Sequence, residues 1–394
     1  MRYDFDKICD RKNTCSLKWD CSASVYHTEG LLPMWIADMD FPAPHCVAEA
    51  IGKRNGHEIY GYTESMPDSL KDAVAGWVLK RHGWKIEHRW LCYTPGVVSA
   101  LSASVLAFTE PGDRIMIQPP VYPPFYNVIR GNGRIPVTNP LKTEAGRYVM
   151  DFDDMERKMK TGVKMMILCS PHNPVGRVWE RKELSRLAEL CVKNNVLLVS
   201  DEIHSDIVFN GHRHIPAASV SHEIEQKSVT CVAASKTFGV AGLTTSATII
   251  PNPELSARFQ NQLKCLGIEF GNVFGIAAME AAYRDGEEWL EQLLEYLSGN
   301  LRVLKDYFDT NIPQIKITEP EGTYLVWLDF SALGLDGKKL NDLIVNRAGL
   351  WLDSGSIFGA GGEGFQRVNI ACPRAILHKA LTQLEYAVNH VQCS

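Results

Sequence analysis

Short strand-like runs, rich in apolar residues and each followed by polar residues, recur through the first two thirds of the chain. They cover residues 163–170, 196–199 and 229–232, and loops and helix-like stretches separate them. In one such stretch, 180–194, apolar residues recur at intervals of three and four, as on one face of a helix. Continuous apolar strands are buried on both faces in parallel sheets. Because strands that alternate with helices form doubly wound sheets, we predict an α/β fold with a large, mostly parallel sheet.

A polar side chain stands just past the end of each of these strands. Asn173 follows the first strand, Asp201 the second and Lys236 the third. Taken singly, each could be a side chain that ends a strand in water. In a doubly wound sheet, however, ligands bind beyond the carboxyl ends of the strands, where these residues would meet. A lysine there can form a Schiff base if burial lowers its pKa enough to free the amine.

A turn upstream of these strands has the features of an anion site. Strand residues run into Pro95-Gly96, and a helix of small residues begins with Val97 and Val98. The first backbone N–H groups of a helix are unpaired and its dipole favours negative charge, so a phosphate could bind there. Further on, prolines fix a loop that carries Tyr122, whose ring could stack on a planar ligand or only pack the loop.

These strand ends carry the groups that pyridoxal phosphate (PLP) requires. PLP needs an amine for its aldehyde, a carboxylate beside its ring nitrogen and a cradle for its phosphate. Lys236 would supply the amine, Asp201 the carboxylate and the Gly96 turn the cradle. Asn173 could donate a hydrogen bond to the 3-oxygen of the ring, and Ser235 could add a hydroxyl to the phosphate shell.

Composition narrows the class of protein. The 394 residues carry a net charge of −5 without a long basic run, so a broad nucleic-acid or anionic-membrane surface is not expected. No apolar stretch approaches the roughly 18 residues that span a membrane. The 11 cysteines are scattered, which is typical of reduced thiols in the cytoplasm. Asp38 and Asp40 lie close together, as do His212 and His214, but neither pair indicates a metal site.

The chain changes character near residue 285. Beyond it, a long amphipathic helix, shorter strands and a final helix replace the earlier alternation. We therefore predict three parts. An N-terminal segment, 1–45, packs with the small domain; a large cofactor-binding domain covers 46–285; and a small α+β domain covers 286–394.

Five longer runs resemble those of a known family. They are WIADMDF at 35–41, SPHNPVGRVW at 170–179, DEIHSD at 201–206, SKTF at 235–238 and RVNIACP at 367–373. Over essentially its whole length, the chain resembles the fold-type-I PLP-dependent enzymes of the aminotransferase class I/II superfamily. Within it, the sequence is most similar to the cystathionine β-lyase/cystalysin branch of MalY/PatB-type C–S lyases. Ordinary aminotransferases usually have tyrosine where this chain has His204.

The resemblance implies a role for each site residue. Lys236 would hold the cofactor covalently, and Asp201 would pair with its ring nitrogen. Cofactor contacts are also implied for Asn173, Tyr122, His204, Gly96, Val97, Val98 and Ser235, and substrate contacts for Arg367, Ala37, Asp38 and Asn173. Arg367 would grip the substrate carboxylate, a task that suits a guanidinium fork. Tyr62 would reach the phosphate of the neighbouring subunit, so the resemblance implies a homodimer.

For the reaction, the resemblance implies α,β-elimination from L-cysteine S-conjugates such as L-cystathionine, giving pyruvate, ammonia and a thiol. Lys236 would take the Cα proton, and Lys236 or Tyr122 would protonate the leaving sulfur. The same residues would serve an amino-acid aminotransferase, and a regulatory binding protein that uses the PLP fold is the alternative of another class. Two positions depart from the pattern: Gly239 replaces an asparagine usual in this branch, and Thr244 replaces an arginine of many aminotransferases.

Overall fold

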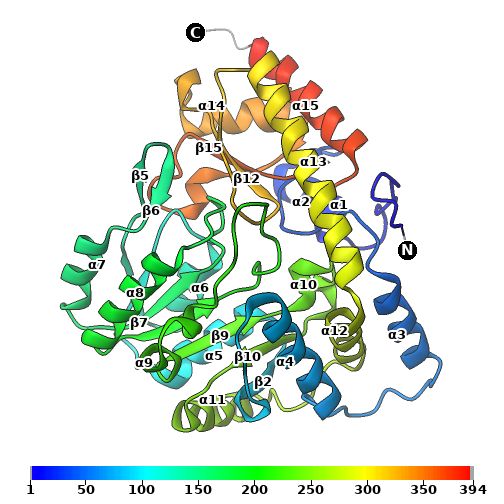
Figure 1. Cartoon of the computed structure of the whole chain (residues 1–394). Coiled ribbons are helices and arrows are strands. Elements are labelled where there is room, and N and C mark those ends of the chain that lie inside the picture. Colours follow the sequence, from blue (N-terminus) through cyan, green and yellow to red (C-terminus); the bar gives the residue numbers. More distant parts are fainter. Residues whose placement is uncertain (1, 391–394) are drawn as a thin grey trace.

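The computed structural model describes residues 2–390 (Figure 1). Its larger sheet has seven strands. The order across this sheet is β2-β10-β9-β8-β7-β3-β4, and β10 alone runs antiparallel to its neighbours. In chain order the strands are β2 (Leu91–Thr94), β3 (Arg114–Ile117), β4 (Ile135–Thr138), β7 (Val163–Cys169), β8 (Leu197–Asp201), β9 (Ser228–Val232) and β10 (Ser246–Ile249). The predicted α/β fold with a doubly wound, mostly parallel sheet is confirmed.

Helices cover both faces of this sheet, because its strands are apolar on both sides. One face packs against α5 (Val97–Phe108), α6 (Pro124–Gly131) and α11 (Pro253–Cys265). The other face packs against α7 (Phe152–Met159), α8 (Arg181–Lys193) and α9 (His222–Glu225). Next to β10 on that face lie α3 (His45–Asn55), α4 (Asp68–His82) and α12 (Val273–Asp285).

The second sheet is antiparallel and has the order β11-β12-β15-β14. Its strands are β11 (Lys316–Thr318), β12 (Leu325–Asp329), β14 (Asp353–Ser354) and β15 (Phe365–Asn369). The helices around it are α13 (Glu287–Asn311), α14 (Gly337–Asp342) and α15 (Arg374–Asn389). The long helix α13 buries one apolar stripe, at Trp289, Leu290, Leu293, Leu297, Leu301, Leu304 and Phe308.

The N-terminal segment runs along this second sheet. It contains α1 (Leu17–Asp20), α2 (Ser22–Tyr26) and β1 (Leu32–Pro33). Strand β1 pairs in parallel with β13 (Leu350–Trp351), and the Trp35 ring stacks on the Trp351 ring with centroids 4.2 Å apart. The division into 1–45, 46–285 and 286–394 stays a prediction.

Two smaller elements lie among the strands of the large sheet in the chain order. Strands β5 (Lys142–Glu144) and β6 (Arg147–Val149) form a hairpin, and α10 (Ala234–Thr237) is a single turn directly after β9. Within residues 2–390, no helix is both long and apolar enough to cross a membrane. The loops after β2, β7, β8 and β9 all open at the same edge of the large sheet, facing the second sheet.

Candidate active site

A cavity lies at this edge of the large sheet and contains most of the residues that the sequence singled out. Those that line it are Ala37, Gly96, Val97, Val98, Tyr122, Asn173, Asp201, His204, Ser235, Lys236 and Arg367. They come from segments as far apart as the N-terminal loop and β15. Asp38 and Tyr62 do not line the cavity. Residues that sequence reasoning missed, such as Ser99, Ile203 and Thr245, carry no local signal of a site.

Lys236 lies on α10, the single helical turn that follows β9. Its Nζ points back toward the N-terminal loop and donates a hydrogen bond to the backbone oxygen of Ala37 at 2.7 Å. Burial lowers the pKa of the Lys236 amine to about 8; the nearby Asp38 and Asp201 carboxylates oppose this shift, and the Arg367 guanidinium adds to it. The amine is therefore partly neutral near pH 8, as a nucleophile or a base requires.

Asp201 is the last residue of β8 and is buried at the bottom of the cavity. Its carboxylate accepts a backbone hydrogen bond from Ile203 at 3.1 Å, and among residues 2–390 no cation forms an ion pair with it. The residues beside it on the adjacent strands are Cys169 and Cys231. Burial, with a smaller effect of the Glu202 carboxylate, raises the pKa of Asp201 to about 7. A protonated ring nitrogen would supply the missing positive charge, so Asp201 fits the carboxylate that PLP requires.

The start of α5 provides the anion cradle. Gly96 precedes this helix with φ +96°, ψ 155°, a conformation available essentially only to glycine, although a Cβ there would meet no other atom within 4 Å. The N–H groups at the start of α5 have no partner within the helix, and they lie beside the hydroxyl-bearing residues Ser235, Thr244 and Thr245. Backbone N–H groups, a helix dipole and hydroxyls fit a phosphate.

Asn173 and Arg367 form a buried pair on the opposite side of the cavity. Arg367 Nη1 donates to Asn173 Oδ1 at 2.8 Å, which leaves the Asn173 NH₂ group free to donate to a ring oxygen. Arg367 Nη2 contacts the backbone oxygen of Trp35 and the carboxylate of Asp353, its cross-strand neighbour on β14. Arg367 Nε is buried without a partner and can donate to a substrate carboxylate.

Two further side chains of the cavity, His204 and Tyr122, carry titratable groups. His204 is buried with Nδ1 unpartnered, and burial, aided by the Lys236 and Arg367 charges, lowers the pKa of the His204 imidazole to about 3. This histidine is therefore neutral at pH 7. Tyr122 lies in the loop before α6, and burial together with the Asp201 charge raises the pKa of its hydroxyl to about 12. The Tyr122 hydroxyl consequently stays protonated and can act as an acid.

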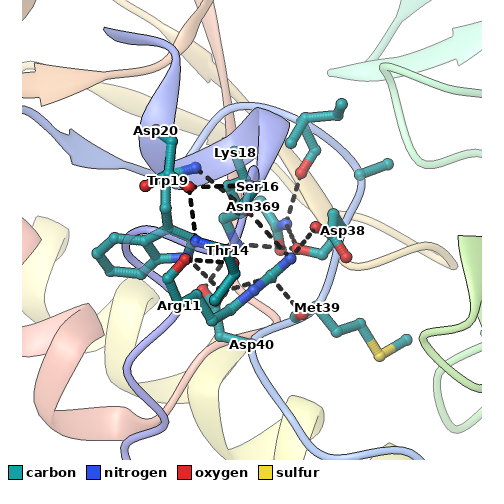
Figure 2. A network of polar contacts seen from close by, with 12 residues as sticks. Arg11, Thr14, Ser16, Lys18, Trp19, Asp20, Asp38, Met39, Asp40 and Asn369 are labelled. Atoms are coloured by element: carbon teal, nitrogen blue, oxygen red, sulfur yellow. Dashed lines mark hydrogen bonds and ion pairs between the residues drawn. The ribbon is translucent and has the colours of Figure 1, made fainter. Parts of the chain in front are cut away.

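Asp38 and Tyr62 lie outside the cavity for different reasons. The Asp38 carboxylate pairs with Arg11 at 2.6 Å, as Figure 2 shows. The Tyr62 ring packs against Phe270, with centroids 4.6 Å apart, and the side chain is 90% exposed. A substrate contact of Asp38 and a contact of Tyr62 with a neighbouring subunit both stay predictions.

Comparisons with known proteins agree with this geometry. Cystathionine beta-lyase PatB of Bacillus subtilis is 45% identical to the chain over 98% of its length and 100% of PatB. The structure of PLP-containing cystalysin from Treponema denticola is similar over all of both chains, with a TM-score of 0.96 and 36% identity. A PLP-bound protein from Clostridium difficile 630, provisionally described as an aminotransferase, gives a TM-score of 0.97 with 46% identity and covers 98% of this chain and 100% of its own. Residues 31–384 match the family "Aminotransferase class I and II", to which the chain therefore belongs.

Proposed function

We propose that the protein is a PLP-dependent C–S β-lyase that acts on L-cystathionine or related L-cysteine S-conjugates. The products would be a thiol, pyruvate and ammonia. The observation that carries the proposal is the placing of a lysine of lowered pKa and a buried, unpaired carboxylate in one cavity, in a chain 45% identical to a cystathionine beta-lyase.

The cavity residues divide into those that would hold the cofactor and those that would hold the substrate. Lys236 would hold PLP covalently, Asp201 would face its ring nitrogen and Asn173 its 3-oxygen. Tyr122 would stack on the ring, His204 would contact the cofactor, and Gly96, Val97, Val98 and Ser235 would hold the phosphate. When bound, PLP supplies an electron sink for the negative charge that remains at Cα after proton removal.

Arg367 and the N-terminal loop would orient the substrate. The unpaired Nε of Arg367 can donate to the substrate carboxylate, and the guanidinium stays in place because Asn173 and Asp353 bind its other nitrogens. Ala37, which forms part of the cavity wall, would contact the substrate. In this orientation the Cα–H bond of the substrate would face Lys236.

The amine of the substrate would take the place of the Lys236 amine on the cofactor, and the freed Lys236 would then move the proton. Its neutral amine accepts the proton from Cα, the Cβ–S bond breaks, and the electron pair of that bond leaves with sulfur. The Lys236 ammonium, or the protonated Tyr122 hydroxyl, returns a proton to the thiolate. The remaining amino acid fragment takes up one water after release and yields pyruvate and ammonia.

We also propose that the enzyme is a cytoplasmic homodimer in which Tyr62 completes the neighbouring site. Large apolar side chains are exposed near Tyr62, at Ile59, Tyr60 and Phe270. An interface with a second copy would bury them. The ten cysteines from Cys9 to Cys372 are free, which supports a reducing compartment.

The test is an end-product assay with cofactor-loaded protein and L-cystathionine in the absence of any keto acid. Pyruvate, ammonia and homocysteine should form over many turnovers, and Lys236→Ala should abolish them. Absence of pyruvate from every thioether tested would refute the proposal. If turnover required a keto acid and produced the corresponding amino acid, the same residues would serve an aminotransferase instead.

A further inference from the structure

The loop at residues 35–39, which covers the Lys236 amine, has no helix or strand of its own. Each of its five backbone oxygens accepts a hydrogen bond from a side chain. The donors are Arg367 to Trp35, Asn369 to Ile36, Lys236 to Ala37, Lys18 and Asn369 to Asp38, and Arg11 to Met39. Side chains from the N-terminal segment, α10 and β15 therefore set the position of this loop. Figure 2 shows Arg11, Lys18 and Asn369 of this set.

On the N-terminal side, Arg11 contacts the loop through both a carboxylate and a backbone oxygen. Its Nη2 pairs with Asp38 Oδ2 at 2.6 Å, and its Nη1 binds Asp40 Oδ1 at 2.9 Å and the Met39 oxygen at 3.0 Å. The Asp40 carboxylate has other partners, the Lys18 amine at 2.7 Å and the Trp19 indole at 2.8 Å. Among residues 2–390, Arg11 is the single cation that forms an ion pair with Asp38.

Asp38 follows Ala37, whose oxygen binds the Lys236 amine. Of the charges that act on this amine, the Asp38 carboxylate has the largest effect, and it favours the ammonium. Other charged or titratable groups that line the cavity with the amine are Asp201 on β8, Arg367 on β15, Cys169 on β7, Tyr122 before α6 and His204 after β8. The buried Tyr324 hydroxyl lies near Asp38 as well, and burial together with the Asp38 charge raises the pKa of Tyr324. Arg11 lies on the far side of Asp38 and balances its charge.

We propose that Arg11 is a positioning residue for Lys236. It neutralises the Asp38 carboxylate, and it holds in place the loop whose Ala37 oxygen accepts a hydrogen bond from the Lys236 amine. The inference deepens the proposed function and rests on it, because a lysine that moves protons must be available in its neutral form. Without Arg11, the unpaired Asp38 charge would keep the amine protonated at the pH of turnover. Without the Asp38 charge, the amine would lose its proton at lower pH.

The experiment measures the acetylation rate of Lys236 by acetic anhydride against pH, by peptide mass spectrometry, in the full chain freed of cofactor. Only the neutral amine reacts, so the midpoint reports its protonation. We expect Arg11→Gln to raise the midpoint by about one pH unit and Asp38→Asn to lower it by a similar amount. Arg11→Lys should restore most of the wild-type midpoint. Arg89→Gln removes a surface ion pair with Glu87, at the end of β2 away from the cavity, and should change nothing.

A second readout is the pH profile of kcat for pyruvate release by the loaded enzyme. Its rising limb should move to higher pH in Arg11→Gln and to lower pH in Asp38→Asn. An unchanged midpoint in Arg11→Gln, or shifts of equal sign in Arg11→Gln and Asp38→Asn, would overturn the proposal, because simple loosening of the loop has no reason to give opposite signs. If Arg11→Gln fails to fold, the isosteric Asp38→Asn decides by its downward shift. The acetylation assay needs no substrate, so its result stands apart from success or failure of the lyase assay.

Discussion

Asp201 offers the sharpest test of the reasoning about the site, because the same carboxylate should harm the empty protein and help the loaded one. Burial raises the pKa of Asp201 from 3.8 to about 7. At 1.36 kcal/mol per unit, a shift of about three units corresponds to about 4 kcal/mol, an upper bound on the cost of the ionised form in the folded chain. The cofactor-free chain binds this proton more tightly when folded, so its stability should fall as the pH rises from about 4 to about 7.

Asp201→Asn removes the charge but keeps an oxygen for the Ile203 N–H. Without cofactor, the free energy of unfolding of this variant should be unchanged near pH 4. It should exceed the wild-type value at pH 8 by up to about 4 kcal/mol. With PLP the order should reverse: loss of a buried charge pair costs about 3–5 kcal/mol, so cofactor affinity should fall by a factor of about 100 or more. Urea unfolding of wild type and variant at pH 4 and pH 8, each with and without PLP, measures the difference in free energy of unfolding under the four conditions.

Asp206→Asn is the matched control, five residues away. The Asp206 carboxylate is also buried, but it accepts hydrogen bonds from Trp77, His82 and Thr237. His82 and Thr237, together with the Arg81 charge, hold the pKa of Asp206 below its usual value despite burial. Its substitution should therefore destabilise the cofactor-free chain at pH 8. If Asp201→Asn destabilised that chain in the same way, Asp201 would not be an unpaired carboxylate awaiting a positive partner, and the reasoning would be wrong.

Two further substitutions test the cavity. Arg367→Lys removes the planar guanidinium and its Nε donor, so KM for the substrate should rise about 10- to 100-fold with a smaller change in kcat. An unchanged KM would exclude Arg367 from carboxylate binding. Gly96→Ala should lower the free energy of unfolding by about 1–3 kcal/mol and also weaken PLP binding, whereas Gly112→Ala, at an exposed turn with φ +87°, should affect stability alone. Equal PLP affinity in the two glycine variants would contradict a phosphate cradle at α5.

The positions of the strands in the sequence were predictable, because buried strands appear as short apolar runs. Residues 196–199 are continuously apolar, residues 229–232 are apolar apart from Thr230, and these two runs became the inner strands β8 and β9. Since parallel strands end at one edge, the meeting of Asp201 with Lys236 followed from that pattern. The antiparallel direction of β10 left no trace in the sequence, because an apolar strand reads the same in either direction.

What the side chains bind was decided by the tertiary structure. The spacing of Arg367 from Asp353 says nothing until β14 and β15 pair and set the two side by side. Asn369 reaches the Ile36 and Asp38 oxygens across more than 330 residues, and Arg11 finds Asp38 only because the N-terminal segment lies against that loop. The sequence by itself determined the helices and strands, because local sterics and apolar periodicity act within a few residues. Ion pairs and hydrogen bonds between distant segments depend on how the elements pack, which no local pattern encodes.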